Sequence, residues 1–143
     1  MIIVDTNVLS EMLREQPNPA VENWLAIQDG STLYISAVSE AELRTGVALM
    51  APGRRREKMA EALEEILMDV FGSHVLSFDR GAAKAYAGIF SSRRTAGRPI
   101  SQFDAQIAAI AHARGGAVAT RNVKDFWGCG IEVINPWEHR IAT

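Results

Sequence analysis

Five residues of this sequence have side chains that suit metal chemistry: the acids Asp5, Glu42, Asp104 and Asp125, and the amide Asn122. They lie far apart along the chain, so they can act together only if the fold collects them. Acids that converge on one spot repel one another unless a cation lies between them, and oxygen ligands without neighbouring His or Cys favour Mg²⁺ or Mn²⁺ over zinc. A divalent ion held in this way suits the hydrolysis of a phosphodiester bond.

Each acid also has a structural interpretation. An isolated Asp after a strand, such as Asp5, more often caps the next helix than binds a ligand. Ser101 and Asp104 have the spacing of a capping box, with Asp in place of Glu. Glu42 suits an exposed helix face. Glu40 competes with it, because residues two apart on a helix lie about 200° apart and cannot both face one site.

Other chemistries have less support in the sequence. The three histidines, His74, His112 and His139, form no zinc-binding helix pattern, and no glycine-rich phosphate loop precedes a lysine and a hydroxyl residue. Asp125 can cap a short turn before Phe126. A phosphoaspartyl enzyme would carry a second acid two residues after the first, and that position is Asn7.

Short apolar runs that alternate with helical patterns predict the elements that position these acids. Residues 2–4 are β-branched and typical of a strand buried on both faces. Further strands are expected at 33–35, 74–78, 117–119 and 131–134. The alternation predicts an α/β fold with a parallel sheet and helices on both faces. Asp5 then follows a strand at its carboxyl end, which is the edge where open α/β sheets bind ligands.

Helix starts and stops can also be predicted. Thr6 or Asn7 can cap a first helix, and Ser36 or Ser39 can cap the helix after the second strand. Asn18-Pro19 starts a helix between them, with Pro at its first position. After Pro52-Gly53 we expect a long amphipathic helix with basic first turns.

The second half of the chain gives three more expectations. Asp79 can cap an alanine-rich helix over residues 82–90, and a polar, basic connection is expected over 91–99. Ser101 then opens a helix over 103–114, which Gly115-Gly116 ends.

Composition limits the class of protein. The 143 residues, 48% of them hydrophobic, suit one compact domain with a real core. A net charge of −2 excludes a globally basic nucleic-acid coat, although it allows a local basic groove. Cys129 is the single cysteine, which excludes a disulfide framework and favours a reducing cytoplasm. We expect no membrane span and no signal peptide, because no apolar run is long enough and Asp5 interrupts the first one.

Four motifs of the chain resemble those of the PIN-domain nucleases, and within them the VapC-type (FitB-like) toxins of bacterial toxin-antitoxin modules. The motifs are IVDTNV at 3–8, SAVSEAELRTG at 36–46, FDAQIAA at 103–109 and ATRNVKDF at 119–126. Each is weak alone, but they occur in the family's order and span nearly the whole chain. The resemblance implies a single PIN domain over residues 1–143. Its fold would be a three-layer sandwich with a central parallel sheet of about five strands and helices on both faces.

The resemblance also implies the site. Asp5, Glu42 and Asp104 match the family's acidic triad, which selects Glu42 over Glu40. Asp5 and Asp104 would hold Mg²⁺ or Mn²⁺, and Glu42 would complete the site directly or through water. Thr6, Asn7 and Thr120 would orient these ligands by hydrogen bonds.

This chain departs from the family's pattern at the fourth acid position. Many members carry Asp where this chain has Asn122. A neutral amide adds no charge to a metal site. Either Asn122 orients a water molecule or a phosphate, or Asp125 supplies the fourth carboxylate.

The implied activity is endoribonucleolytic cleavage by a homodimer. A small VapB-like antitoxin would inhibit it, and only the complex with the antitoxin would bind operator DNA. Arg44 matches the family's Glu-Leu-Arg-x-Gly stretch. Arg93, Arg94 and Arg98 are candidates for contact with RNA or antitoxin, as is the basic stretch 54–58, although such clusters are at least as often plain solvated surface.

Two other functions are compatible with the sequence. The chain can be a catalytically weak PIN-like subunit that binds an antitoxin and supports operator binding, and Asn122 is the best argument for this. A metal-dependent DNA nuclease is the weaker alternative, because the chain lacks large insertions to grip a duplex.

Overall fold

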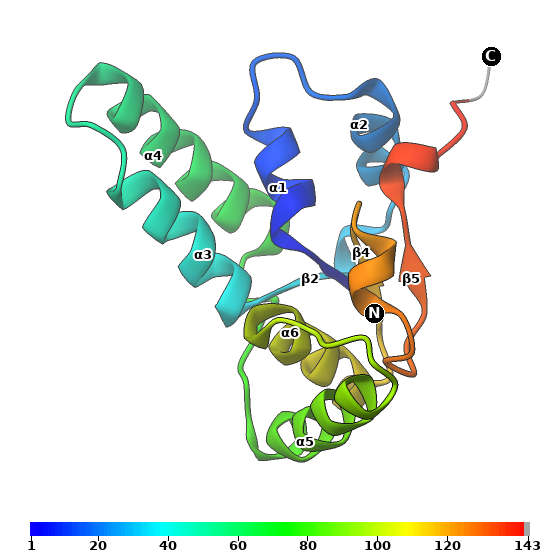
Figure 1. The fold of residues 1–143 in the computed structure, drawn as a ribbon. Helices are drawn as coiled ribbons and strands as arrows, with labels where there is room; N and C mark the ends of the chain where they lie inside the picture. Colours follow the sequence, from blue (N-terminus) through cyan, green and yellow to red (C-terminus); the bar gives the residue numbers. More distant parts are fainter. Residues whose placement is uncertain (142–143) are drawn as a thin grey trace.

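The structure, a computed structural model, describes residues 1–141 (Figure 1). Its strands are β1 (Ile2–Val4), β2 (Leu33–Ser36), β3 (Val75–Leu76), β4 (Ala117–Ala119) and β5 (Val133–Ile134). Its longer helices are α1 (Thr6–Met12), α2 (Pro19–Ala26), α3 (Ala37–Ala48), α4 (Arg54–Ile66), α5 (Arg80–Thr95) and α6 (Gln102–Arg114). Short helical turns are η1 (Gly30–Thr32), η2 (Leu67–Phe71), η3 (Val123–Phe126) and η4 (Pro136–Glu138).

All five strands form one parallel sheet in the order β3-β2-β1-β4-β5. β1 lies at its centre, with Ile3 opposite Tyr34 of β2 and Val118 of β4. The sheet therefore delivers the residues after β1, β2 and β4 to one edge. This confirms the predicted α/β fold with a parallel sheet of five strands.

Two apolar layers enclose the sheet, because successive strand side chains point to opposite faces. Ile3 and Val118 point to the layer formed with α5 and α6, and Val4 and Ala119 point to the layer formed with α1 to α4. Figure 1 shows α5 and α6 packed together on one side, and α3 and α4 as a paired arm that projects from the other. The three-layer sandwich is thus confirmed.

Polar caps begin most of the helices. The Ser36 hydroxyl accepts a hydrogen bond from Ser39 N, and the Asp79 and Ser101 side chains accept from Ala82 N and Asp104 N. These caps agree with the sequence. At α1 the expectation that Thr6 or Asn7 caps the helix was wrong, and the alternative that Asp5 caps it is confirmed, because Asp5 accepts from the first backbone amide of that helix.

The predicted connection over 91–99 was also wrong in its first half, because α5 continues to Thr95. Ile89 and Arg93 lie four residues apart on the buried face of α5, so the second half of this helix packs inward despite its polar sequence. The third and fifth strands are shorter than expected, at two residues each. No helix within residues 1–141 is long and apolar enough to cross a membrane.

Candidate active site

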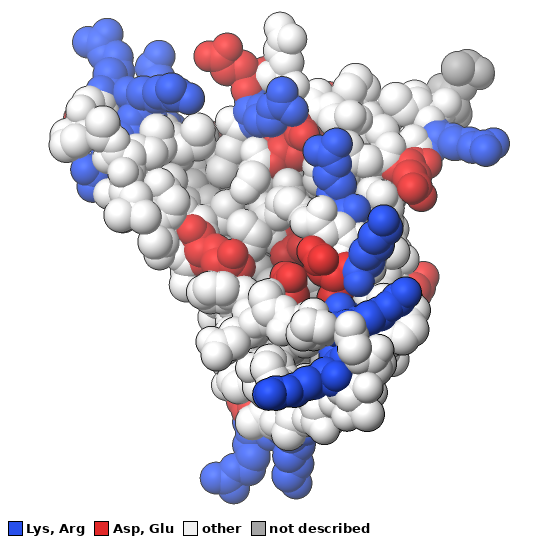
Figure 2. Space-filling model, viewed as in Figure 1, with Lys and Arg blue, Asp and Glu red and all other residues white. Residues whose placement is uncertain are grey.

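The carboxyl ends of the central strands open into an acidic pocket of about 580 Å³. Figure 2 shows the acidic side chains gathered in the middle of one face, in a hollow beside the α3–α4 arm. The lining residues come from the loops and helices that follow all five strands. They are Asp5, Thr6, Asn7, Ser10, Glu11, Arg14, Glu42, Asp104, Arg121, Asn122 and Trp137.

Asp5 lies at the bottom of this pocket and is only 5% exposed. Its Oδ1 accepts a 2.8 Å hydrogen bond from Thr6 N. Its Oδ2 accepts from the Thr120 hydroxyl at 2.8 Å and from Asn7 Nδ2 at 3.2 Å. Asp5 is therefore a helix cap and a pocket carboxylate at once, so the two interpretations of this residue are compatible.

The environment of Asp5 disfavours its charged form. Burial is the main cause and raises the pKa of Asp5 from 3.8 to about 6, the negative charges of Asp104 and Glu42 adding to the effect. Hydrogen bonds from Thr120 and from Thr6 N partly offset the rise in this pKa. A cation in the pocket would relieve both the burial of charge and the repulsion.

Glu42 faces the same pocket from α3. Its Oε1 accepts a 3.1 Å hydrogen bond from the Thr6 hydroxyl, and burial, with repulsion from Asp104, raises the pKa of its carboxyl. Glu40 points elsewhere and pairs with Arg44 at 3.1 Å. The two residues thus diverge as their helical spacing predicts, and Glu42 is the one that lines the pocket.

Asp104 enters the pocket from the first turn of α6. Its backbone N–H donates to the Ser101 hydroxyl at 3.1 Å, so the predicted capping contact is present. Burial is the main cause that raises the pKa of Asp104, and the negative charge of Asp125 adds to it. Ser101 and the positive charge of Arg93 act in the opposite direction on this pKa.

Asn122 and Asp125 lie differently with respect to the pocket. Asn122 is part of its lining, and its backbone N–H donates to the Thr120 hydroxyl at 3.1 Å. Asp125 is exposed on η3 and outside the lining, where its charge acts on Asp104 from a distance. Of these two candidates for the fourth position, only Asn122 lines the pocket.

The arginines differ in whether their side chains are free to contact RNA or an antitoxin. Arg93 is buried and donates to the carbonyl oxygens of Arg98, Asp125 and Trp127 at 2.6–2.9 Å. Its guanidinium ties α5 to the loop around η3, so the prediction that Arg93 contacts RNA or antitoxin was wrong. Arg94 is exposed.

Two further arginines are exposed but already engaged within the chain. Arg98 lies 4.1 Å over the Trp127 ring. Arg44 pairs with Glu40 and Glu64 on the arm. Both keep exposed guanidinium groups that a partner could compete for.

A divalent cation fits the donor set of this pocket. Within residues 1–141, no three His, Cys, Asp or Glu side chains are close enough to form a finished metal site. Mg²⁺, however, takes only one or two protein carboxylates and keeps several waters. Asp5 accepts three hydrogen bonds, while a carboxylate offers about four acceptor positions, so one remains for a cation. The lining contains no His or Cys, which favours a hard, oxygen-binding ion.

Five residues that line the pocket were not among the site residues expected from the sequence: Ser10, Glu11, Arg14, Arg121 and Trp137. Glu11 is buried and pairs with Arg14 at 2.9 Å. It lies four residues after Asn7, a helical spacing that could have indicated the shared face. Arg121 and Trp137 follow β4 and β5, and the carboxyl-edge rule could have found both.

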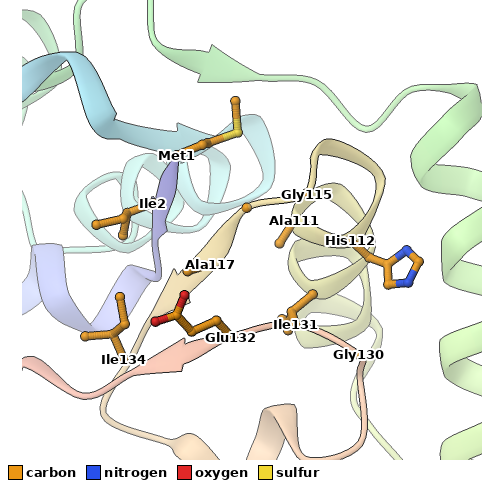
Figure 3. Close-up of a pocket in the computed structure, with 11 residues that line it drawn as sticks. Met1, Ile2, Ala111, His112, Gly115, Ala117, Gly130, Ile131, Glu132 and Ile134 are labelled. Atoms are coloured by element: carbon orange, nitrogen blue, oxygen red, sulfur yellow. The ribbon is translucent and has the colours of Figure 1, made fainter.

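A second hollow lies at the opposite edge of the sheet (Figure 3). Its volume is about 490 Å³, and Met1, Gly116 and Ile134 contribute to its lining. Glu132 and His112 are its only titratable side chains, and Figure 3 shows the His112 ring directed away from Glu132. Without a cluster of converging polar groups, this hollow offers no comparable chemistry.

Comparison with known proteins gives consistent matches over nearly the whole chain. A profile of the PIN domain matches residues 2–126. The plasmid stability protein StbB of Pseudomonas syringae pv. tomato is 48% identical over 138 residues, which cover 96% of this chain and 99% of that protein. The VapC ribonuclease Y4jK of Sinorhizobium fredii is 42% identical over the same coverage, and Toxin FitB of Neisseria gonorrhoeae is 42% identical over 137 residues, again 96% and 99% of the two chains.

Solved structures agree with these matches. The FitAcB structure from Neisseria gonorrhoeae aligns with a TM-score of 0.90 and 41% identity, covering 96% of this chain and 99% of that one. A structure of FitAB bound to an IR36 DNA fragment aligns with a TM-score of 0.91 and 38% identity over the full length of both chains.

Proposed function

The chain belongs to the PIN-domain family, and from this premise we propose that it is a cytoplasmic endoribonuclease, dependent on Mg²⁺ or Mn²⁺, that acts as the toxin of a type II toxin-antitoxin system. The observation that carries the proposal is the convergence of Asp5, Glu42 and Asp104 on one open pocket. The 42% identity to a protein named VapC ribonuclease supports RNA as the substrate.

The pocket residues would divide the work. Asp5 and Asp104 would hold the ion, and Glu42 would contact it directly or through water. When bound, the ion supplies an activated water and stabilises the charge on the phosphate and the leaving oxygen. Hydrogen bonds from Thr120 and Asn7 orient the Asp5 carboxylate, and a hydrogen bond from the Thr6 hydroxyl orients the Glu42 carboxylate.

Basic side chains around the pocket would hold the RNA backbone. Arg94 and Arg98 lie exposed at the end of α5 and beyond it, and the stretch 54–58 provides four further basic residues at the start of α4. Figure 2 shows basic side chains over the turn that joins α3 and α4. Such contacts give affinity that falls with rising salt and carry little sequence information.

A groove between α1 and the α3–α4 arm supports the proposal that the protein binds an antitoxin. It has a volume of about 1080 Å³ and shares four residues with the acidic pocket: Thr6, Ser10, Arg14 and Glu42. Leu43, Val47 and other apolar side chains line it. An amphipathic segment of a VapB-like antitoxin could lie in this groove and direct a basic side chain to the acids.

The proposal includes a homodimer, and binding to operator DNA only as a complex with the antitoxin. The full-length similarity to a FitAB structure bound to DNA supports the second point. Val47→Glu would place a charge in the groove and should abolish copurification with the co-expressed antitoxin. Copurification that survives this change would place the antitoxin elsewhere.

The test of the activity is a cleavage assay with purified protein. Structured RNA should be cut in Mg²⁺ or Mn²⁺, and excess chelator or Asp5→Ala should abolish cutting. Unchanged cutting in either case would overturn the metal mechanism. A DNA strand of matched sequence serves as a control, and equal cleavage of DNA would favour a general nuclease.

Asn122 supports a second candidate function. It lines the pocket at the position where the family resemblance leads one to expect an acid, and it adds no charge to a metal site. The chain would then be a catalytically weak subunit that binds an antitoxin and tightens operator binding. This candidate is correct if the protein neither cuts RNA nor slows growth on expression, yet strengthens binding of the antitoxin to its operator.

A further inference from the structure

Arg121 and Trp137 form one side of the acidic pocket. Arg121 follows β4, and Trp137 lies in η4, directly after β5. These strands are parallel neighbours, and their pairing continues where Thr120 N donates to the Ile134 carbonyl at 2.8 Å. Both side chains therefore reach the same edge of the sheet as Asp5.

The Arg121 guanidinium lies 5.3 Å from the centre of the Trp137 ring. No carboxylate within residues 1–141 lies within ion-pair distance of Arg121, although Asp5, Glu42 and Asp104 line the same pocket. Its positive charge is therefore neither neutralised by a salt bridge nor buried. The guanidinium is available to an anion that enters beside the acids.

The loop that carries Arg121 is held in place. Its backbone N–H donates to Asn7 Oδ1 at 3.3 Å, and Asn7 Nδ2 donates in turn to Asp5 and Thr120. Trp137 is half-buried against the apolar cluster that includes Trp24, and the Asn135 side chain caps its turn at 3.0 Å. The Arg121 backbone and the Trp137 ring are thus held at the rim of the pocket. Together they form a platform on which the exposed guanidinium can turn away from the ring.

A cation beside a partly exposed indole ring matches the chemistry of one unpaired nucleotide. Bases stack on aromatic side chains, and the adjoining phosphate attracts arginine. In a double helix the bases stack on one another and cannot reach such a ring. The platform therefore favours single-stranded RNA over duplex.

We infer that Arg121 and Trp137 bind an unpaired nucleotide next to the phosphate to be cut, with the base stacked on Trp137 and its phosphate on Arg121. This inference rests on the proposed nuclease function. The subsite selects unpaired segments of RNA and sets their position relative to Asp5 and Asp104. An incoming base displaces the Arg121 guanidinium from the ring towards the phosphate.

Binding is measured in an Asp5→Asn background, so that cutting does not interfere. The probes are a labelled single-stranded RNA and the same labelled strand in a duplex. Fluorescence anisotropy gives the Kd of each probe. Trp137→Leu, which keeps apolar packing, should weaken single-strand binding roughly 5- to 150-fold, the loss expected for one base–aromatic stack. Trp137→Tyr should restore binding to within about threefold, because it keeps an aromatic face.

Arg121→Gln provides an independent variant at an exposed position. It should weaken binding and lower the slope of log Kd against log salt by about 0.7, the share of one phosphate contact on a single strand. Phe78→Leu is the matched control, since Phe78 is an exposed aromatic residue outside the pocket lining. It should leave the Kd unchanged.

Three results would overturn the subsite. The first is that Trp137→Leu binds the single strand as tightly as the Asp5→Asn protein does. The second is that Trp137→Tyr and Trp137→Leu lose the same affinity while their thermal stabilities are equal. The third is that the duplex binds as tightly as the single strand. Failure of the proposed function is distinguishable: the native protein would not cut RNA, while binding would still depend on Trp137. Conversely, if the native protein cuts RNA and Trp137→Leu does so with unchanged kcat/KM, the nuclease function stands and the subsite falls.

Discussion

The Thr120 hydroxyl donates a 2.8 Å hydrogen bond to Oδ2 of Asp5, which joins the end of β4 to the end of β1. Thr120 is completely buried, and its oxygen also accepts from Asn7 Nδ2 and from Asn122 N. One hydroxyl therefore connects the central acid, the first turn of α1 and the loop that carries Asn122. It also lowers the pKa of Asp5 against the larger effect of burial.

Thr120→Val should raise the pKa of Asp5 above its present value of about 6, because valine has the same shape but no hydroxyl. The proton then competes better with a cation for Asp5. The pH midpoint of Mn²⁺ binding, measured by calorimetry, should therefore move to higher pH. A midpoint that does not move would show that this hydrogen bond has no effect on the ionisation of Asp5.

Asp5→Asn should stabilise the metal-free protein at neutral pH. The pKa of Asp5 is raised in the folded state, so its contribution to stability is fully present below about pH 4 and is lost as the pH rises through about 6. A shift from 3.8 to about 6 is worth about 3 kcal/mol at most. We expect a gain of about 1–3 kcal/mol at pH 8, since asparagine makes the surrounding hydrogen bonds less well.

Urea unfolding of native and Asp5→Asn protein, in chelator at pH 4 and pH 8, measures this effect. The stabilisation by Asp5→Asn should be present at pH 8 and absent at pH 4. Equal differences at both pH values would mean that the ionisation of Asp5 does not destabilise the fold.

Glu42→Gln and Glu40→Gln form a matched pair on α3. Glu42 lines the pocket and accepts from Thr6, whereas Glu40 pairs with Arg44 away from the pocket. Glu42→Gln should reduce metal affinity or cleavage by about 10- to 100-fold, as is usual for groups next to a metal site. Glu40→Gln loses only an exposed ion pair, so its kcat/KM should be close to native. Equal losses in the two variants would contradict the assignment of Glu42 to the site.

Arg93→Met should destabilise the protein by about 3 kcal/mol, because three carbonyl oxygens lose a charged, buried donor. Arg94→Met is its control, and we expect a change within about 0.5 kcal/mol at this exposed position. The midpoints of denaturant unfolding give both values. Similar midpoints for the two variants would mean that Arg93 does not hold the loop around η3.

Local patterns in the sequence predicted the sheet and the helices that carry the pocket acids, whereas the choice of Asp5, Glu42 and Asp104 as a triad came from the resemblance to the PIN-domain nucleases. Residues 2–4 form a β-branched strand that ends at Asp5, and the caps Ser36 and Ser101 begin the helices that carry Glu42 and Asp104. Helical spacing separated Glu42 from Glu40. Each of these inferences used residues only a few positions apart.

The errors and omissions involved long-range contacts. Arg93 looks like a surface residue among Arg94 and serines, and only its bonds to carbonyls more than thirty residues away make it internal. Trp137 follows a strand that the sequence predicts, so the carboxyl-edge rule places it at the right edge of the sheet. That it meets the acids depends on the pairing of β5 with β4, which local patterns do not give. Such relationships depend on tertiary packing, which local propensity does not encode.

The most direct test of the metal-dependent nuclease is the rate of single-turnover RNA cleavage as a function of Mn²⁺ concentration, for native protein and for Asp104→Asn. The native rate should rise with Mn²⁺ and saturate, and it should vanish in chelator. Asp104→Asn keeps the shape of the side chain but loses its charge, so its rate should be at least about 100-fold lower at the same Mn²⁺ concentration. Cleavage that does not depend on Mn²⁺, or an Asp104→Asn rate equal to the native rate, would contradict the assignment of the acidic pocket as the metal site of a nuclease.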